Sequence, residues 1–411
     1  MAKQETVVAH DRKATLEQRR RRKMAQSAHA FVRGSIEHFY EWITSRHAPA
    51  LPEGPAIWIC GDCHVGNLGP LADDDGHVHI RLRDFDQCAV AHPAFDLCRL
   101  ALSLAVLARS SDLPGLSTVR ILEGLLAGYE SAFPDADHAP PSLPPYLRTQ
   151  IQRAHARSWK ALARERTQGK TLRLPLGSAF WPITTRERRA LTSLFQEEAM
   201  TCLATQLRGR PDSGKVRVLD AAYWRKGCSS LGRLRYAVLL DIEGAAEDGN
   251  DLCLMDVKEA ASLIVPVART ATVPKDDGER VLEGARRLSP ALGDRMGAST
   301  LLGRPVFVRE LLPQDLKLDI VSLKQKKVRR LAAYLGHVVG RAHARQMDND
   351  TRKDWCRQLK KNHSRSLEAP SWLWRATVGL LADHERVYLE HCRRYVGLEE
   401  SSTAGHRAAT H

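Results

Sequence analysis

The sequence lacks the long apolar runs of a membrane protein. A membrane-spanning helix needs about 18 or more consecutive apolar residues, and no stretch of this chain approaches that length. The first residues also contain no apolar core of signal-peptide length. We therefore expect no membrane partner and a cytoplasmic location.

Cysteines and aromatic residues are also few. The chain has nine cysteines, an odd number that cannot all pair, which argues against a disulfide-stapled secreted module. Aromatic residues make up only 6% of the chain, yet 43% of all residues are hydrophobic. That balance is typical of a globular protein, and a chain of 411 residues is long enough to bury a large core.

Acidic residues are outnumbered by basic ones, which leaves a formal net charge of +14. Such an excess indicates polyanionic partners, and both nucleic acids and ATP are polyanions. The densest basic run, at residues 19–23, fits either a phosphate-binding arm or the solvated face of a helix. No zinc-finger, basic-zipper or RNA-recognition pattern accompanies this run, so a nucleic-acid partner has no motif to support it.

Apolar spacing and turn residues divide the chain into five segments. We expect a basic helical segment at residues 1–48, followed at 49–210 by a part that combines a strand pair with helices. Strand-like segments separated by turns occupy residues 211–312, and helices return at 313–400. The tail at 401–411 has a composition typical of disorder. This order predicts an α+β protein.

The most informative stretch is GDCHVGN at residues 61–67, which is followed by DFD at 84–86. Asp62 and Asn67 lie in a loop that leaves a short apolar strand, and Asp84 ends the next predicted strand. Pairing in a hairpin is expected to bring the three side chains to one end of two strands. Mg²⁺ prefers oxygen ligands such as a carboxylate and an amide carbonyl, and an acceptor hydroxyl needs a nearby carboxylate. The pattern therefore suits phosphoryl transfer.

These motifs resemble the catalytic core of aminoglycoside-phosphotransferase-like members of the protein-kinase-like superfamily. The resemblance implies that Asp62 is the catalytic aspartate, that Asn67 and Asp84 hold Mg²⁺, and that Asp96 braces the catalytic loop. It also implies ATP as the donor and a small molecule as the acceptor. With the K-M-x-x-S-x-x-x-F-x-R-G pattern at 23–34, the chain is further similar to a bacterial domain-of-unknown-function family within that superfamily.

A glycine-rich loop precedes the catalytic loop in kinases, but here the matching stretch follows it. Residues 226–232 (KGCSSLG) join two strand-like segments and resemble a phosphate-binding loop. Gly227 and Gly232 have the outer spacing of G-x-G-x-x-G, while Ser229 takes the position of the middle glycine and Ser230 follows it. The resemblance implies that these four residues bind the nucleotide, although a side chain at Ser229 would crowd the phosphates.

A lysine and a helix follow this loop in the order that kinases use. Lys258 resembles the strand lysine that binds phosphate, and Glu283, or Glu279 one turn earlier, is placed to pair with it. The motifs are thus present in a rotated order, which implies a two-lobed, circularly permuted kinase-like fold with additional helices. Such a rotation is tolerable because chain termini usually lie at the surface. The expected activity is ATP- and Mg²⁺-dependent phosphorylation of a small-molecule hydroxyl.

Several other interpretations fit parts of the same motifs. Residues 60–64 read C-x-x-C-H, which also occurs at haem attachment sites, in redox pairs and in zinc sites. No second feature of those sites accompanies it, so both cysteines are expected to be packing residues. A metal-dependent hydrolase site could use the aspartates and His64, but it leaves the glycine loop and Lys258 unexplained. His343 is expected to be a structural histidine on a packed helix.

Two further alternatives concern what the site does with ATP. Transfer of AMP instead of the γ-phosphoryl group stays open, because the same parts can hold ATP in either orientation. A pseudokinase-like ATP-binding protein, with a nucleic acid or an acidic protein as its partner, also stays open.

Overall fold

A computed structural model of the chain describes most of its residues and leaves several segments outside. The described residues are 9–73, 75–110, 115–133, 141–156, 173–205, 215–228, 230–242, 252–312, 325–361 and 371–395. Ser229 and the tail at 401–411 lie outside them. The described chain combines helices with antiparallel strands, which confirms the α+β class. No helix within these residues is long and apolar enough to span a membrane.

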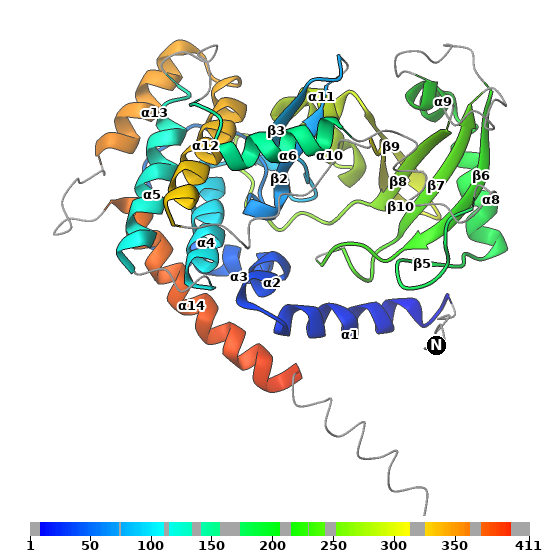
Figure 1. Cartoon of the computed structure of the whole chain (residues 1–411), viewed down its shortest axis with the longest axis horizontal. Coiled ribbons are helices and arrows are strands. Elements are labelled where there is room, and N and C mark those ends of the chain that lie inside the picture. The colour runs from blue at the N-terminus through cyan, green and yellow to red at the C-terminus, as the bar shows by residue number, and fades with distance from the viewer. Residues whose placement is uncertain are drawn as a thin grey trace, which may run out of the picture.

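A six-stranded antiparallel sheet, in the order β5-β6-β7-β8-β10-β9, forms one side of the molecule (Figure 1). Its strands are β5 (Phe180–Trp181), β6 (Val216–Trp224), β7 (Arg235–Ile242), β8 (Leu252–Glu259), β9 (Met296–Leu301) and β10 (Arg304–Glu310). Every residue of β7 is buried, because both faces of the central strands are covered. The helices that cover the outer face are α8 (Thr185–Leu194) and α9 (Glu198–Thr205).

The sheet begins earlier in the chain than the sequence predicts. Trp181 in β5 and Leu191 and Met200 in α8 and α9 join the buried cluster on the outer face of the sheet. Residues 180–205 therefore pack with the sheet, although the boundary expected from composition lies at 211. The change in composition near residue 211 therefore marks the start of the long strands. It does not mark the point at which the chain begins to pack with the sheet.

The helix α10 (Asp277–Leu288) and the short α11 (Pro290–Gly293) connect β8 with β9. The Asp276 side chain caps α10 by accepting a hydrogen bond from the Glu279 backbone N–H at 3.0 Å. The apolar face of α10 contributes Val281 and Ala285 to the large core that the helices share. We call β5–β10 with α8–α11 the sheet unit.

The other side of the molecule is a bundle of helices, which we call the helical unit (Figure 1). Its helices are α2 (Ala28–Gly34), α3 (Ile36–Ile43), α4 (Ala94–Ser110), α5 (Gly115–Glu130), α6 (Pro145–His155), α12 (Gln325–Ala344), α13 (Asn349–Lys361) and α14 (Trp372–Tyr395). Segments that precede and follow the sheet in the sequence thus share one core. Trp372 is fully buried in it, as expected for a packing aromatic residue.

Two small antiparallel pairs lie where the helical unit meets the sheet unit. A hairpin joins β2 (Leu68–Ala72) to β3 (Val78–Leu82), which confirms the hairpin expected between the GDCHVGN and DFD motifs. The strand β1 (Ile57–Ile59) pairs with β4 (Ala89–Ala91). The short 3₁₀ helix η1 (Val65–Asn67) leads directly into β2. The two pairs hold the ends of the GDCHVGN loop and of the DFD segment.

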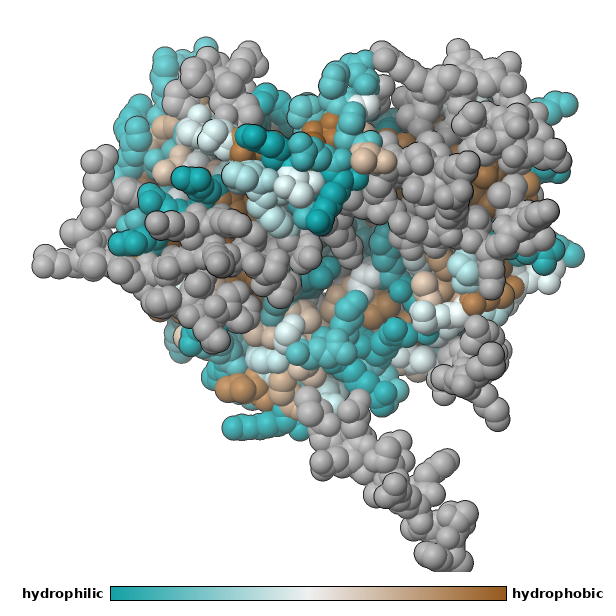
Figure 2. Space-filling model, viewed as in Figure 1, coloured by the Kyte–Doolittle hydropathy of each residue, from teal (hydrophilic) through white to brown (hydrophobic). Residues whose placement is uncertain are grey.

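The helix α1 (Arg12–Ala25) runs from the sheet unit toward α14 and contacts both units (Figure 1). Arg12 forms an ion pair of 2.6 Å with Glu187 on α8, and Lys23 Nζ donates to the Gly227 carbonyl at 2.7 Å. Arg20 donates to the Gly34 carbonyl. The remaining arginines of the basic run are exposed, and Figure 2 shows the outer side of α1 as hydrophilic. The run thus has a solvated face and an inward face.

Helices α5 and α12 approach each other through glycines. A Cβ atom at Gly128 would overlap the Ala333 carbonyl oxygen, and one at Gly336 would overlap the Leu125 carbonyl oxygen. A Cβ at Gly340 would lie 2.6 Å from the Tyr129 carbonyl oxygen. All three obstacles are backbone atoms, so a side chain at any of these positions forces the helices apart.

We expect Gly128→Ala to lower the free energy of unfolding by about 2 kcal/mol, because overpacking outweighs the better helix propensity of alanine. Gly124→Ala is the matched comparison, since its Cβ would meet the Arg329 carbonyl oxygen at 3.1 Å, where a small shift relieves the contact. Urea unfolding followed by circular dichroism measures both variants. Equal stability of Gly128→Ala and the unchanged protein would contradict this packing.

Candidate active site

A buried carboxylate fixes the start of the GDCHVGN loop. Asp96, at the beginning of α4, is fully buried and accepts hydrogen bonds from the backbone N–H groups of Cys60 at 2.8 Å and Gly61 at 2.9 Å. The His343 Nε2 atom lies 3.2 Å from Asp96, and the Nδ1 atom lies 2.9 Å from the Tyr129 hydroxyl. Asp96 therefore braces the loop, as the resemblance implies, and His343 is a buried structural histidine, as expected, that supports Asp96.

The Asp62 carboxylate is oriented by an arginine from the helical unit. Arg99, on α4, donates from Nε to Asp62 Oδ1 at 2.9 Å, while His64 Nε2 lies 3.8 Å from Asp62 Oδ2. Burial raises the pKa of Asp62, the charge of Arg99 lowers it in part, and the charges of Asp84 and Asp86 raise it further. The net shift is upward, which makes Asp62 a stronger base than an exposed aspartate.

Asn67 lies beside Asp62 and Asp84. The Asn67 side-chain nitrogen donates to the Asp62 carbonyl at 2.9 Å, and the Arg83 backbone N–H donates to the Asn67 carbonyl at 2.9 Å. The first bond uses the amide nitrogen, so the amide oxygen is the side-chain atom that Asn67 has to offer a cation. Asn67 and Asp84 line the same cavity.

Lys258 joins the sheet unit to the DFD segment. Its side chain is almost fully buried, and Nζ lies 2.6 Å from Asp86 Oδ2 and 3.3 Å from Asp84 Oδ1. The ammonium group also lies 5.4 Å from the centre of the Phe307 ring. Two sequence motifs far apart in the chain therefore meet at one cation.

The two aspartates of the DFD segment have opposite pKa shifts. Burial alone would raise the pKa of Asp84, but the charges of Lys258, Arg309 and Arg235 lower it below the usual value. Burial raises the pKa of Asp86, and Asp84 adds to that shift against the attraction of Lys258. Asp84 is thus the carboxylate that stays ionised most readily.

The helix α10 does not supply the carboxylate that pairs with Lys258. Glu283 pairs with Arg287 at 2.7 Å, and Glu279 is exposed. Lys258 instead takes both of its carboxylate partners from the DFD segment, which sequence reasoning missed because these contacts cross between the two units. The sequence prediction of a pair with Glu283 is therefore not seen in this structure.

An arginine of the same helix holds the DFD segment by its backbone. Arg280 is almost fully buried and donates to the carbonyls of Asp86 at 3.0 Å, Cys88 at 2.8 Å and Ala261 at 2.6 Å. Its carboxylate partner is Asp277 on its own helix, at 2.9 Å. The oxygen atoms that it contacts outside the helix belong to the main chain, so no side-chain motif reveals the contact. The signal in the sequence is a charged residue on the apolar face of a predicted helix.

The described part of the glycine loop has the backbone that its glycines allow. Gly227 and Gly232 have φ angles of 98° and 95°, a region that other residues rarely adopt. The Ser230 hydroxyl donates to the Lys226 carbonyl at 2.9 Å, inside the turn. Gly227 and Ser230 line the same cavity as Asn67, whereas Gly232 lies against α1.

That cavity, which we call the basic pocket, lies between the glycine loop and the hairpin β2–β3. Five of its lining side chains are cationic and one is a carboxylate. The residues that line it are Arg33, His64, Gly66, Asn67, Arg83, Asp84, Lys226, Gly227, Cys228, Ser230, Arg235 and Arg309. The sequence motifs point to the acidic ligands and the glycine loop, but not to this set of cations, which comes from α2, the end of β3, the glycine loop, β7 and β10.

A second cavity, which we call the acidic pocket, adjoins the first at Asp84. The residues that line it are Arg20, Ile36, Glu37, Asp62, Asp84, Asp86, Gln87, Arg233 and Ile264. The catalytic candidate Asp62 thus faces one pocket while the metal-ligand candidate Asn67 faces the other. Asp84 belongs to both, which places it at the junction.

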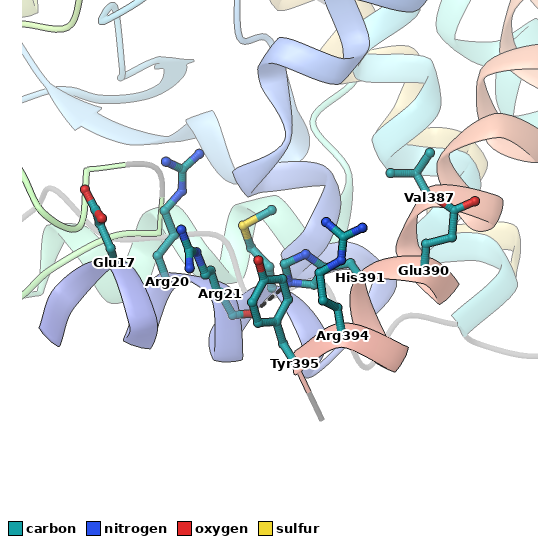
Figure 3. A pocket seen from close by; sticks show the side chains of 9 residues that line it. Glu17, Arg20, Arg21, Val387, Glu390, His391, Arg394 and Tyr395 are labelled. Carbon is teal, nitrogen blue, oxygen red and sulfur yellow. Dashed lines mark hydrogen bonds between the residues drawn. The ribbon is translucent and has the colours of Figure 1, made fainter. Parts of the chain in front are cut away.

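A wider groove lies between α1 and α14, beyond the acidic pocket. Figure 3 shows Arg20 and Arg21 on α1 opposite Arg394 and Tyr395 on α14, and Arg20 also lines the acidic pocket. The Arg21 guanidinium lies 5.5 Å from the centre of the Tyr395 ring, and His391 Nε2 lies 2.8 Å from the Arg21 carbonyl. These contacts tie the two helices together.

The cysteines of the C-x-x-C-H stretch are packing residues. Cys60 and Cys63 are free and fully buried. A hydrogen bond with Cys63 and burial raise the pKa of the Cys60 thiol well above its usual value, and burial raises that of Cys63. Metal binding and redox chemistry use the thiolate, so this environment disfavours both.

The comparisons with known proteins bear on the whole site at once. No curated protein and no solved structure matches the chain. One family of sequences matches residues 12–394, a range that takes in every residue of both pockets. The chain therefore belongs to the family described as an uncharacterized protein conserved in bacteria (DUF2252).

Proposed function

We propose that this protein is an ATP- and Mg²⁺-dependent phosphotransferase that modifies a hydroxyl group of a small molecule. The observation that carries the proposal is the meeting of Lys258 with Asp84 at 3.3 Å, beside Asn67 and Asp62. A phosphate-binding lysine, two metal ligands and a base in one place are the parts that phosphoryl transfer requires.

The topology of the sheet unit supports the same proposal. The glycine loop connects β6 with β7, Lys258 lies on the neighbouring β8, and α10 follows before β9 and β10. This is the order of elements that the kinase resemblance implies for a nucleotide-binding unit. Here it follows the catalytic loop in the chain, which is consistent with a circularly permuted kinase-like fold.

The chemistry of the side chains fits Mg²⁺. An ionised carboxylate from Asp84 and the amide oxygen of Asn67 are hard oxygen ligands, and Mg²⁺ is usually bound by few protein groups besides phosphates and water. In addition, Asp86 Oδ1 is buried and finds no hydrogen-bond partner in the described part of the chain. When bound, the metal would neutralise charge on the transferred group and the leaving group.

The residues of the chain then have separate tasks in the reaction. Asp62 orients the acceptor hydroxyl and accepts its proton as the new bond to phosphorus forms. Arg99 keeps the Asp62 carboxylate in place, and Asp96 keeps the loop that carries it in place. Lys258 contributes a positive charge to the phosphates, and its contact with Asp86 holds it in position.

The acidic pocket supports a small polar acceptor. Its lining offers the carboxylates of Glu37, Asp62 and Asp86 and the amide of Gln87, which are hydrogen-bond partners for hydroxyl groups. The apolar part of the lining is limited to Ile36 and Ile264. A polyhydroxylated compound matches this lining better than an apolar one.

The metal-ligand role of Asp84 predicts a loss of nucleotide-dependent stabilisation. Mg²⁺ and ATP at about 100 times the dissociation constant should stabilise the unchanged protein by about 2.7 kcal/mol. Asp84→Ala should lose most of this effect in a thermal-shift titration, whereas Asp354→Ala, on the surface of α13, should retain it. The absence of metal-dependent stabilisation in the unchanged protein would refute the proposal.

The base role of Asp62 predicts a variant that binds but does not react. Asp62→Asn preserves the size and the hydrogen bond from Arg99, but removes the proton acceptor. ATP turnover with a panel of hydroxylated compounds should fall by about 100-fold or more, while the thermal shift with Mg²⁺ and ATP persists. Asp350→Asn, at an exposed site, is the control. Unchanged turnover in Asp62→Asn would exclude this residue as the base.

A further inference from the structure

The face of the sheet next to Lys258 is covered by an ion triad. Arg235 on β7 donates from Nε and Nη2 to the two carboxylate oxygens of Asp256 at 2.8 and 2.5 Å, and Arg309 on β10 lies 3.5 Å from the same carboxylate. Asp256 precedes Lys258 by two residues on β8, so both side chains lie on the same face. Asp256 is 1% exposed and Arg235 is 6% exposed.

The apolar part of this face is packed by the protein's own side chains. Phe180 and Trp224 stack with ring centres 5.6 Å apart, next to Leu254. The other members of this cluster are Leu174, Ala222, Ala237 and Leu311. A purine needs an apolar slot, and the apolar residues that would line one beside the triad are already buried against each other.

The basic pocket, by contrast, has the lining of an anion site. The pKa of Lys226 is well below its usual value because of burial and because of the like charges of Arg235, Arg309 and Arg83. The Nε atoms of Arg33 and Arg309 are buried and have no hydrogen-bond partner among the residues that the structure describes. Crowded cations with unused donors are stabilised by a multiply charged anion such as a polyphosphate.

We infer that the basic pocket holds the β- and γ-phosphates of ATP, with the α-phosphate beside Asp84 and the nucleoside outside the pocket, so that the protein transfers AMP. This inference rests on the proposed function and specifies which group moves.

The positions of the two pockets assign the leaving group. The acceptor lies beside Asp62 in the acidic pocket and the transferred group lies beside Asp84 at the junction, so the basic pocket on the other side holds the leaving group. Five cations suit pyrophosphate. ADP as leaving group would place its two phosphates in the pocket and its adenosine beyond them, beside the ion triad, where the apolar side chains that the structure describes are already packed against each other.

The step balances with ATP as the only co-substrate. The acceptor oxygen forms a bond to the α-phosphorus, and the bond from that phosphorus to the oxygen bridging to the β-phosphorus breaks. The electron pair leaves with pyrophosphate, whose charge the arginines and Lys226 stabilise. The proton of the acceptor hydroxyl moves to Asp62, which faces Asp84 from the acidic pocket.

Binding of fragments tests the orientation without knowledge of the acceptor. Inorganic tripolyphosphate with Mg²⁺ should displace ATP with a dissociation constant within about tenfold of that of ATP, whereas adenosine should not compete. Lys226→Met should weaken tripolyphosphate binding by about tenfold or more, while Lys215→Met, at an exposed site of the same unit, should not. Effective competition by adenosine with weak tripolyphosphate binding would overturn the inference.

Product analysis separates this inference from the proposed function. With ATP labelled at the α- or the γ-phosphorus and the panel of hydroxylated acceptors, we expect α-label on the acceptor and release of pyrophosphate. Release of ADP with γ-label on the acceptor would overturn AMP transfer and leave the phosphotransferase proposal intact. Failure of ATP, tripolyphosphate and adenosine to bind at all would overturn both.

Discussion

The contact of Lys258 with Asp84 and Asp86 is the constraint on which the site depends. A buried ammonium group is costly unless it is paired, and removing one partner of a buried pair costs about 3–5 kcal/mol. Lys258 belongs to the sheet unit, whereas both aspartates follow the hairpin β2–β3, which lies where the two units meet. The sheet must therefore stay docked on the DFD segment, and Arg280 strengthens the docking through main-chain carbonyls. The same contact brings Lys258 together with Asp84, the candidate metal ligand.

The GDCHVGN loop is fixed from the opposite side by a second buried network. Trp355 donates to the Tyr129 hydroxyl at 3.1 Å, Tyr129 contacts His343, and His343 contacts Asp96, which receives the backbone of the loop. The glycine contacts between α5 and α12 set the spacing of the two helices that carry Tyr129 and His343. Helix packing far from the pockets thus helps to determine where Asp62 lies, together with the direct bond from Arg99.

Most of the correct sequence predictions came from motifs, whereas the contacts between charged residues far apart in the chain were not predicted. The hairpin followed from residues close together in the chain, the bracing role of Asp96 followed from the family resemblance, and both were found. The sequence predicted that the partner of Lys258 lies on α10. A lysine can pair with any carboxylate nearby, and only the tertiary fold determines which carboxylate is nearby. Arg280 and the ion triad of Asp256 escaped for the same reason, because a single charged residue within a strand or a helix carries no spacing signal.

Part of the excess of basic residues in the chain is concentrated at this site. Carboxylates gather in the acidic pocket and cations in the basic pocket, with Asp84 between them. A polyphosphate alone would be repelled by Asp62 and Asp86, and a metal ion alone would be repelled by the arginines. The cations of the basic pocket stabilise the negative charge of a polyphosphate, and the carboxylates of the acidic pocket stabilise the positive charge of a metal ion. A metal-bound polyphosphate that spans the junction therefore matches both pockets. The rotated order of the motifs does not affect this match, because electrostatic complementarity depends on positions in space and not on the sequence of segments.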